Sequence, residues 1–327
     1  MTLSPGNHDI TIYTNSTGVF FDCFILTTEP RCLPAASSLT YEIYRYKLHP
    51  YIAFQTISAP FTSPVGIDYH EDTNSVIVSN NYPSGNPNAF SRIDTTGTQT
   101  SFSKASGVTD EIKIGIVRSG NPSGWVSGDL FTGNGNDGEI MRITDGGQTV
   151  IKTWCKLGGT SNITVGLLRG KYTLELYSNM QGGLYIDRTG VWNYNLVVCT
   201  NIGKIYTVGW NPTNTSTCGD VTLIGDAKGI HLEGLVTIPD NATVWGNLAG
   251  RILAGAENEG KLWAVGTDLI LTSYSLNEPY NIEDMDWIED NENFFGVAYG
   301  IGRILGVSYN FFKPYVGKVM LTQGNSS

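Results

Sequence analysis

The stretch GRILAGAENEGKLWAVG, residues 250–266, has the form that decides the fold. Two short and mostly apolar runs flank a turn that contains Gly260. Runs of this length and composition on either side of a turn are typical of paired β-strands. A glycine at the turn supplies the positive φ angle that such a connection needs. Residues 250–266 therefore predict a β-hairpin.

The same form recurs along the chain, at an irregular spacing that centres on roughly 45–50 residues, the range of propeller blades. A further apolar element precedes each hairpin, and in a propeller it would be the innermost strand, which lines the central channel. The turn of 250–266, which carries Glu257 and Glu259, would then lie at the rim, away from the channel mouth. The other hairpins are predicted at 74–94, 128–144, 194–209 and 293–308, and the inner strands at 63–70, 109–117, 182–190, 229–238 and 281–288.

These five units, together with the strand-like stretch 39–57, predict an all-β, six-bladed β-propeller. A single domain over residues 1–327 is the simplest interpretation, with 1–38 partly irregular. The last strand, within 317–323, is expected to close the ring beside an N-terminal strand. Closure of this kind removes exposed strand edges.

The composition and short motifs of the chain indicate which binding partners and which cellular compartment to expect. Charged residues make up only 15% of the chain and the net charge is −10, so a nucleic-acid partner is not expected. No apolar run is long enough to predict a membrane span. No signal peptide is visible, but five N-glycosylation sequons favour a secreted protein, although turns rich in Asn, Ser and Thr also create sequons by chance. The sequons begin at Asn15, Asn162, Asn214, Asn241 and Asn325.

The five cysteines suggest two disulfides. Cys23 and Cys32 bracket a short hairpin-like segment, and Cys199 and Cys218 flank another, which leaves Cys155 unpaired. Partly buried, inert cysteines are an equally good interpretation. No C-x-x-C pair occurs and the four histidines are scattered, so no zinc site is expected.

Several motifs resemble a family of secreted six-bladed propellers that is distantly related to the NHL and gluconolactonase/regucalcin groups. They lie at 64–87, 167–170, 184–191, 231–235, 249–265 and 282–300, and the resemblance covers roughly residues 60–325. The sequons and the cysteines suggest a secreted member of a fungal type. The chain also resembles the fungal propeller hetero-Diels–Alderases, which join tropolone quinone methides to humulene-type terpenes. One departure is the insertion 171–181 after LLRG (167–170), which we interpret as a loop.

The starts of the predicted inner strands carry ionisable side chains that a ring would bring together. Such carboxylates can bind Ca²⁺, which in a metal-dependent lactonase polarises the ester carbonyl. They can also be solvated groups at the channel mouth, and the residues do not reproduce the gluconolactonase pattern. We therefore expect no cofactor, with Ca²⁺ as the alternative. The residues are Glu111, His231, Glu233, Glu283 and Asp284.

Other candidates are a lone cation and side chains suited to a pocket wall. Arg169 lies in an apolar context and suits an anionic or enolate ligand, or else bridges two blades. Tyr69 and His70 end an inner strand, where His70 can donate a proton near neutral pH. Most aromatic residues should fill the core, whereas Trp245 and Phe294 are candidates for the pocket.

These observations leave three hypotheses for the function. The first is a small-molecule enzyme of fungal specialised metabolism, a cyclase of the hetero-Diels–Alderase kind, which needs an apolar pocket and one or two hydrogen-bond donors. We assign Arg169, Glu233, His231 and Glu283 as catalytic, and Tyr69, His70, Glu111, Trp245 and Phe294 as substrate-binding. The second is a Ca²⁺-dependent lactonase, and the third is a non-catalytic secreted binding propeller. Nucleophile and nucleotide motifs are missing from the sequence.

Overall fold

The computed structural model describes most of the chain beyond residue 54. The described residues are 22–27, 42–47, 55–82, 84–108, 113–134, 138–158, 183–257, 259–276, 282–290, 292–299 and 302–323, with the backbone alone at 22–27, 42–47, 55–56 and 322–323. The predicted sites at Asn15, Cys32, Glu111, Asn162, Arg169 and Asn325, the side chain of Cys23 and the insertion 171–181 lie outside this set.

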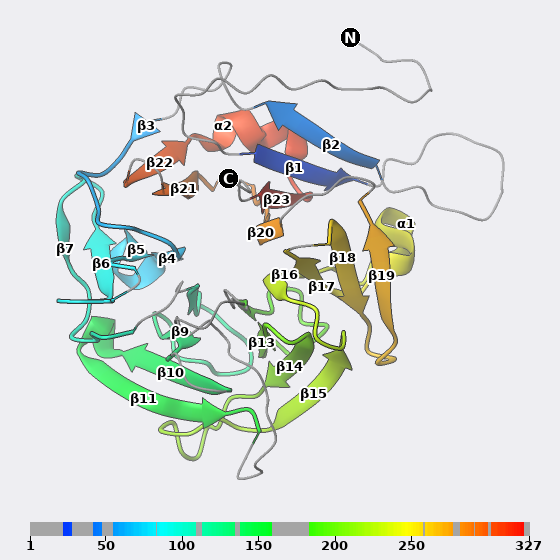
Figure 1. The fold of residues 1–327 in the computed structure, drawn as a ribbon, viewed down its shortest axis with the longest axis horizontal. Coiled ribbons are helices and arrows are strands. Elements are labelled where there is room, and N and C mark those ends of the chain that lie inside the picture. The colour runs from blue at the N-terminus through cyan, green and yellow to red at the C-terminus, as the bar shows by residue number, and fades with distance from the viewer. Residues whose placement is uncertain are drawn as a thin grey trace.

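The described strands form six sheets, five of four strands and one of three, and Figure 1 shows them arranged as a ring. The protein is an all-β propeller. Four of the sheets use four consecutive strands in chain order from the channel outward. These are β4 (Ile67–His70), β5 (Ser75–Ser79), β6 (Phe90–Ile93) and β7 (Gln99–Ser101); β8 (Gly115–Ile116), β9 (Leu130–Gly133), β10 (Glu139–Thr144) and β11 (Thr149–Lys156); β12 (Leu184–Ile186), β13 (Leu196–Cys199), β14 (Lys204–Val208) and β15 (Val221–Asp226); and β16 (Leu232–Thr237), β17 (Ile252–Ala256), β18 (Lys261–Val265) and β19 (Leu271–Ser275).

The other two sheets join the two ends of the chain. β23 (Val319–Gln323) pairs with β1 (Asp22–Thr27) on one side and with β20 (Ile282–Trp287) on the other. β2 (Glu42–Lys47) completes that sheet. The three-stranded sheet contains β21 (Phe294–Ala298), β22 (Arg303–Val307) and β3 (Gln55–Thr56). The expected closure by strands from both ends of the chain is confirmed.

One expectation about the repeat was wrong. The inner strand predicted at 281–288 should have preceded the hairpin 293–308 in the same blade. Instead β20 pairs with β23, whereas β21 and β22 form the adjacent sheet with β3. A local repeat does not reveal that β23 pairs with β1 and β22 with β3, because the strands of each pair lie more than 200 residues apart in the chain.

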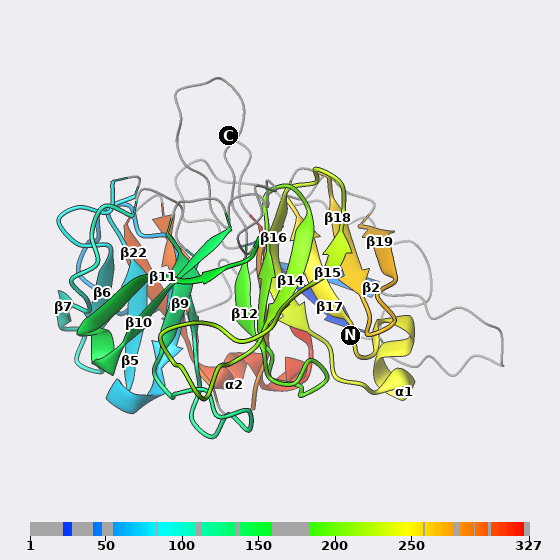
Figure 2. The same ribbon diagram turned by 90° about the horizontal axis from the view of Figure 1, so that it is seen from below.

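Short helices lie on one face of the ring. They are α1 (Ala242–Trp245), α2 (Tyr309–Phe312), η1 (Glu71–Thr73), η2 (Asp145–Gly147), η3 (Gly246–Leu248) and η5 (Lys313–Tyr315). Figure 2 shows α1 and α2 on the same side of the ring. α1 follows β16, so this is the face at which β16 ends. Among the described residues, no helix has the length and hydrophobicity required to cross a bilayer.

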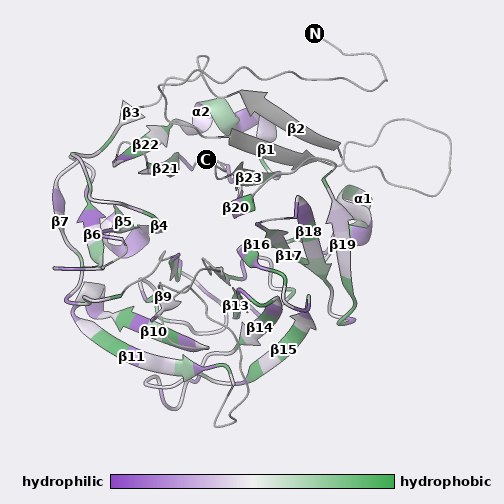
Figure 3. Cartoon of the chain, in the orientation of Figure 1, coloured by the Kyte–Doolittle hydropathy of each residue, from purple (hydrophilic) through white to green (hydrophobic). Residues whose placement is uncertain are grey.

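The core lies between neighbouring sheets, and the first three strands of the sheets contribute to it. Every residue of β5, β13 and β17 is buried. The outer strands β11 and β15 contain both hydrophobic and hydrophilic residues, as Figure 3 shows, and several of their residues are exposed to solvent. Trp245, which we expected beside a ligand, is 3% exposed and packs edge-on against Trp287 in this core.

The disulfide differs from the predicted one: Cys155 bonds Cys218, and Cys199 is a buried free thiol. Cys199 ends β13 beside Ile205, whereas Cys218 lies at the opposite end of β14, in the loop before β15. That loop reaches the outer strand β11 of the neighbouring sheet, which carries Cys155. Burial raises the pKa of the Cys199 thiol, which keeps it protonated and inert.

Removal of this disulfide should lower stability without altering the fold. The bond joins residues 63 apart, and a loop of that length corresponds to roughly 4 kcal/mol of chain entropy in the unfolded state. We expect Cys155→Ser/Cys218→Ser to reduce the free energy of unfolding by roughly 2–4 kcal/mol in urea titrations. A reductant should destabilise the wild type similarly and leave the double variant unchanged. Equal stability of the two proteins would contradict the prediction.

Candidate functional site

The central channel contains a small cavity of about 70 Å³ that opens to solvent. Residues from β4, β12, β16 and β20 and from the segment that contains β8 line it. The lining combines apolar side chains with ionisable or hydroxyl-bearing ones, and so differs from the apolar pocket that a cyclase needs. The polar members are Asp68, Lys113, Tyr185, Arg188, Asp284 and Asp286.

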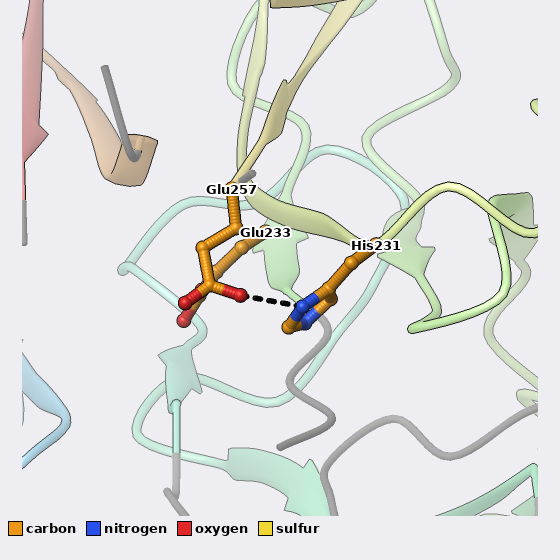
Figure 4. Close-up of side chains that lie close together, drawn as sticks. All are labelled: His231, Glu233 and Glu257. Carbon is orange, nitrogen blue, oxygen red and sulfur yellow. Dashed lines mark ion pairs between the residues drawn. The ribbon is translucent and has the colours of Figure 1, made fainter. Parts of the chain in front are cut away.

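His231 and Glu257 meet at the end of the channel where β16 begins (Figure 4). Their side chains are 2.5 Å apart, from His231 Nδ1 to Glu257 Oε2. Antiparallel pairing explains the meeting, since Leu232 lies opposite Ala256, and the Glu257 amide donates to the His231 carbonyl. The chain does reverse between β17 and β18 as predicted, but our placement of Glu257 away from the channel mouth was wrong.

Glu233 lies beside this pair and is fully buried, with 0% of its side chain exposed. The Nζ atom of Lys113 is 2.9 Å from Glu233 Oε1 and 3.9 Å from a carboxylate oxygen of Glu283. Lys113 also donates to the Glu283 carbonyl at 3.2 Å. We call Lys113, His231, Glu233 and Glu257 the mouth cluster. His231, Glu233 and Glu283, predicted from strand starts, are thus brought close together.

A glycine allows β16 and β20 to approach at this point. Gly234 has a φ of +58° and lies at the register shift between Glu233 and Leu235. A Cβ atom there would be 2.8 Å from the Cα atom of Asp284, so no larger residue fits without a backbone shift. The bulge therefore places the Glu233 carboxylate next to β20.

The mouth cluster does not fit Ca²⁺, the ion that the lactonase alternative implies. One nitrogen and two carboxylate oxygens, one each from His231, Glu233 and Glu257, lie within 4.8 Å of one another. Ca²⁺ prefers six to eight oxygen ligands. The ammonium of Lys113 already supplies positive charge 2.9 Å from Glu233. We therefore derive no reaction step through a calcium ion.

Tyr185 of β12 borders the same channel, is 8% exposed, and belongs to the hydrophobic core that β12 shares with β16 and β17. Its hydroxyl has no hydrogen-bond partner among the described residues. Thr237 lies near enough to affect the pKa of Tyr185, but the two hydroxyls do not meet the geometry of a hydrogen bond. Burial raises the pKa of Tyr185, so the hydroxyl stays protonated. An unsatisfied buried hydroxyl costs roughly 1–3 kcal/mol, which a ligand oxygen would offset.

Arg188 and Asp286 complete the polar part of the channel wall. The Arg188 guanidinium lies 5.7 Å from the centre of the Tyr185 ring, and its Nη1 atom is 3.8 Å from Asp286 Oδ1. Burial raises the pKa of Asp286 to about 6; Arg188 opposes this rise, and Asp68 and Asp284 add to it. The Asp286 side chain is 48% exposed, and because it lines the channel, water there limits the rise. We call Tyr185, Arg188 and Asp286 the channel trio.

Asp68 is held by structural contacts. Its carboxylate accepts hydrogen bonds from the amides of Ile116 and Tyr69, both at 2.7 Å, and is 3.3 Å from Arg118. Arg118 also stacks over the Tyr69 ring at 5.0 Å. These contacts tie β4 to β8, so Asp68 contributes charge to the channel but has little freedom to bind a ligand.

Other predicted pocket residues lie outside the channel lining. His70 is buried, with Nδ1 2.9 Å from the Thr73 hydroxyl and its ring edge against Phe102. The Tyr69 hydroxyl donates to Asn74 at 2.7 Å. Phe294 packs against Phe312. No ligand role follows from these positions, and their assignment stays a prediction.

No known protein-family description matches the chain, and no curated protein matches it. Solved structures with a similar fold include virginiamycin B lyase from Staphylococcus aureus, at 14% identity and a TM-score of 0.46, covering 87% of this chain and 71% of that one. An auxiliary nutrient binding protein from Bacteroides thetaiotaomicron has 10% identity and a TM-score of 0.47, covering 79% and 58%. A structure provisionally assigned as a gluconolactonase has 9% identity and a TM-score of 0.45, covering 79% and 82%. At these identities and TM-scores, no activity is transferred to this chain.

Sequence reasoning missed Lys113 and the whole channel trio. All four lie in predicted inner-strand segments, but only the first residues of those segments were considered. Arg188 and Asp286 lie near the ends of their segments, at the opposite end of the channel wall. An Arg in GGLYIDRTG and an Asp in NIEDMDWI were the signals that could have found them.

Proposed function

We propose that the protein is a small-molecule enzyme that hydrolyses esters or lactones in its central channel without a metal ion. The observation that carries this proposal is the Tyr185 hydroxyl, which is buried in the channel wall without a partner among the described residues. The Arg188 guanidinium lies over the face of the Tyr185 ring, and we propose that both groups donate to one carbonyl oxygen. Donors placed in this way stabilise the oxyanion that forms when the carbonyl is attacked.

Asp286 acts first as the general base and then as the general acid of the proposed hydrolysis. Its carboxylate takes a proton from water as the water oxygen bonds to the carbonyl carbon, giving a tetrahedral oxyanion held by Tyr185 and Arg188. Collapse of that intermediate breaks the bond to the ester oxygen, which receives the proton from Asp286. A lactone and water thus give a hydroxy acid. A pKa of about 6 suits a base that works near neutral pH.

The other hypotheses receive less support from the geometry. A cyclase needs the donors but no base, and the ionisable side chains of the channel do not match its apolar pocket. A calcium-dependent lactonase conflicts with Lys113 at the mouth. A non-catalytic binding propeller would bind a lactone without hydrolysing it.

Tyr185→Phe removes the hydroxyl and leaves the ring. We expect wild-type protein to open γ- or δ-lactones in a pH-stat assay, and Tyr185→Phe to lower kcat by about 10²–10³-fold through loss of an oxyanion donor. Tyr274→Phe, on the outer strand β19, is the matched control and should be unaffected. Thermal-shift evidence for lactone binding without turnover would favour a binding propeller, and equal rates for wild type and Tyr185→Phe would contradict the role of Tyr185.

We further propose that each of the six sheets is one blade of a six-bladed ring. A secreted protein is also proposed. The Cys155–Cys218 disulfide is compatible with an oxidising compartment, and the predicted glycosylation residues Asn214 and Asn241 are exposed.

A further inference from the structure

The mouth cluster has the donor atoms of a transition-metal site and a lysine within it. His231 offers Nδ1, and Glu233 and Glu257 each offer a carboxylate oxygen, all within 4.8 Å of one another. Figure 4 shows these three side chains converging from two neighbouring strand ends. One imidazole and two carboxylates, with a position left open, form a donor set that Zn²⁺ accepts. Lys113 approaches the same carboxylate, at 2.9 Å from Glu233.

We infer that Lys113 is a built-in cation that takes the place of a divalent metal ion, and that its removal turns the mouth cluster into a Zn²⁺ site. This inference concerns the mouth cluster alone and does not depend on the proposed hydrolysis. It follows from the burial of Glu233, from the position of the ammonium group and from the donor set around it.

The burial of Glu233 creates the need for a cation. Its side chain has no exposed surface, and an ionised carboxylate in such a position is strongly destabilising unless positive charge neutralises it. The Lys113 side chain is itself only 12% exposed, so little solvent screens the pair. A metal ion at the same carboxylate would meet direct repulsion from the ammonium, because both are cations.

The backbone holds Lys113 in this position. The Thr132 hydroxyl of β9 donates to the Lys113 carbonyl at 2.8 Å, which fixes the segment just before β8. The side chain then extends across the channel mouth and donates to the Glu283 carbonyl of β20. Lys113 therefore joins three sheets through the strands β8, β16 and β20.

Lys113→Met tests the inference, because methionine keeps most of the unbranched apolar stem of the side chain and removes its charge. We expect the variant to bind one equivalent of Zn²⁺ in isothermal titration calorimetry, at least roughly 100-fold more tightly than wild type, since the repulsion between cations is gone. Co²⁺ should give the visible absorption of a low-symmetry site. Zn²⁺ should also raise the melting temperature of Lys113→Met more than that of wild type.

Two controls separate this site from adventitious binding. Lys113→Met/Glu233→Gln should lose the gain in Zn²⁺ affinity, because the central carboxylate is gone. Lys261→Met removes a lysine paired with Glu259 on the adjacent turn and should bind Zn²⁺ like wild type. A folded Lys113→Met with wild-type Zn²⁺ affinity would overturn the inference, as would equal affinity in the double variant. If Lys113→Met folds only when refolded with Zn²⁺, the inference is supported; failure to fold with or without Zn²⁺ would also overturn it.

Discussion

Replacement of Asp286 by asparagine should lower kcat/KM for lactone hydrolysis by about 10²–10⁴-fold, the range for loss of a general base. Asparagine keeps the shape of the side chain and cannot accept the proton from water. In the wild type, kcat/KM should rise with pH and level off above about 6, where the Asp286 carboxylate is ionised. The variant should lack this rise. Initial rates between pH values of about 4.5 and 8, on either side of that pKa, measure both effects.

Asp284→Asn is the matched control for this experiment. The charge of Asp284 helps to raise the pKa of Asp286, so its removal should move the rise in kcat/KM to lower pH and keep the plateau. A pH profile of Asp286→Asn that still rises near pH 6 would show that another group is the base. An unchanged plateau in Asp286→Asn would exclude Asp286 from the proton transfer.

The stability of the fold should fall over the pH range in which kcat/KM rises. A loss of activity in Asp286→Asn can therefore be distinguished from unfolding. The pKa of Asp286 is raised in the folded chain, so the folded state favours the protonated carboxyl. Its contribution to stability is complete below the unfolded value of about 4 and is lost as pH rises through about 6. The amide that replaces this carboxyl in Asp286→Asn carries no charge at any pH. We therefore expect the variant to unfold in urea at about pH 7 no more easily than wild type.

Loss of Arg142 should destabilise the fold by roughly 3–5 kcal/mol, the cost of breaking a buried ion pair from one side. The Arg142 side chain is 5% exposed and that of Asp129 is 1% exposed, and the two are 2.6 Å apart. The guanidinium also donates to the Thr215 carbonyl and stacks over the Trp210 ring at 4.9 Å. Arg142→Met keeps the aliphatic stem and leaves Asp129 as a buried carboxylate without its cation. Urea unfolding at about pH 7 measures the loss.

The pH dependence of this loss provides its control. Burial already raises the pKa of Asp129 against the effect of Arg142, and removal of the guanidinium raises it further. A protonated Asp129 needs no cation, so the difference between wild type and Arg142→Met should shrink as pH falls towards about 4. Arg142→Met/Asp129→Leu should be more stable than Arg142→Met alone at neutral pH. A loss of unfolding free energy below about 1 kcal/mol at neutral pH would contradict the prediction, because exposed ion pairs have effects of that size.

Local patterns in the sequence predicted the hairpins correctly. The turn in 250–266 lies between β17 and β18, and Gly260 has the expected positive φ of +58°. Alternation, turn residues and strand propensity act over a few residues, so a single segment contains the information needed. The places of β22 and β23 in the ring were not predictable in this way, because their partners β3 and β1 lie at the other end of the chain.

The site was predicted in part. His231 and Glu233 were found because both belong to the start of one inner strand. Glu257 was assigned to the rim because its turn was considered apart from the register with β16. Lys113 was missed because its partner Glu233 lies 120 residues further along the chain, and no local pattern marks such a pair.

Local sequence patterns were enough to predict the strands, their turns and the all-β class, because each of these depends on residues close together in the chain. Only the tertiary structure decided which charges meet. The Cys155–Cys218 bond, the Lys113–Glu233 pair and the channel trio each join different sheets. Their formation depends on how the ring brings sheet ends and inner strands together, and a difference of one residue in register would send each side chain to the opposite face.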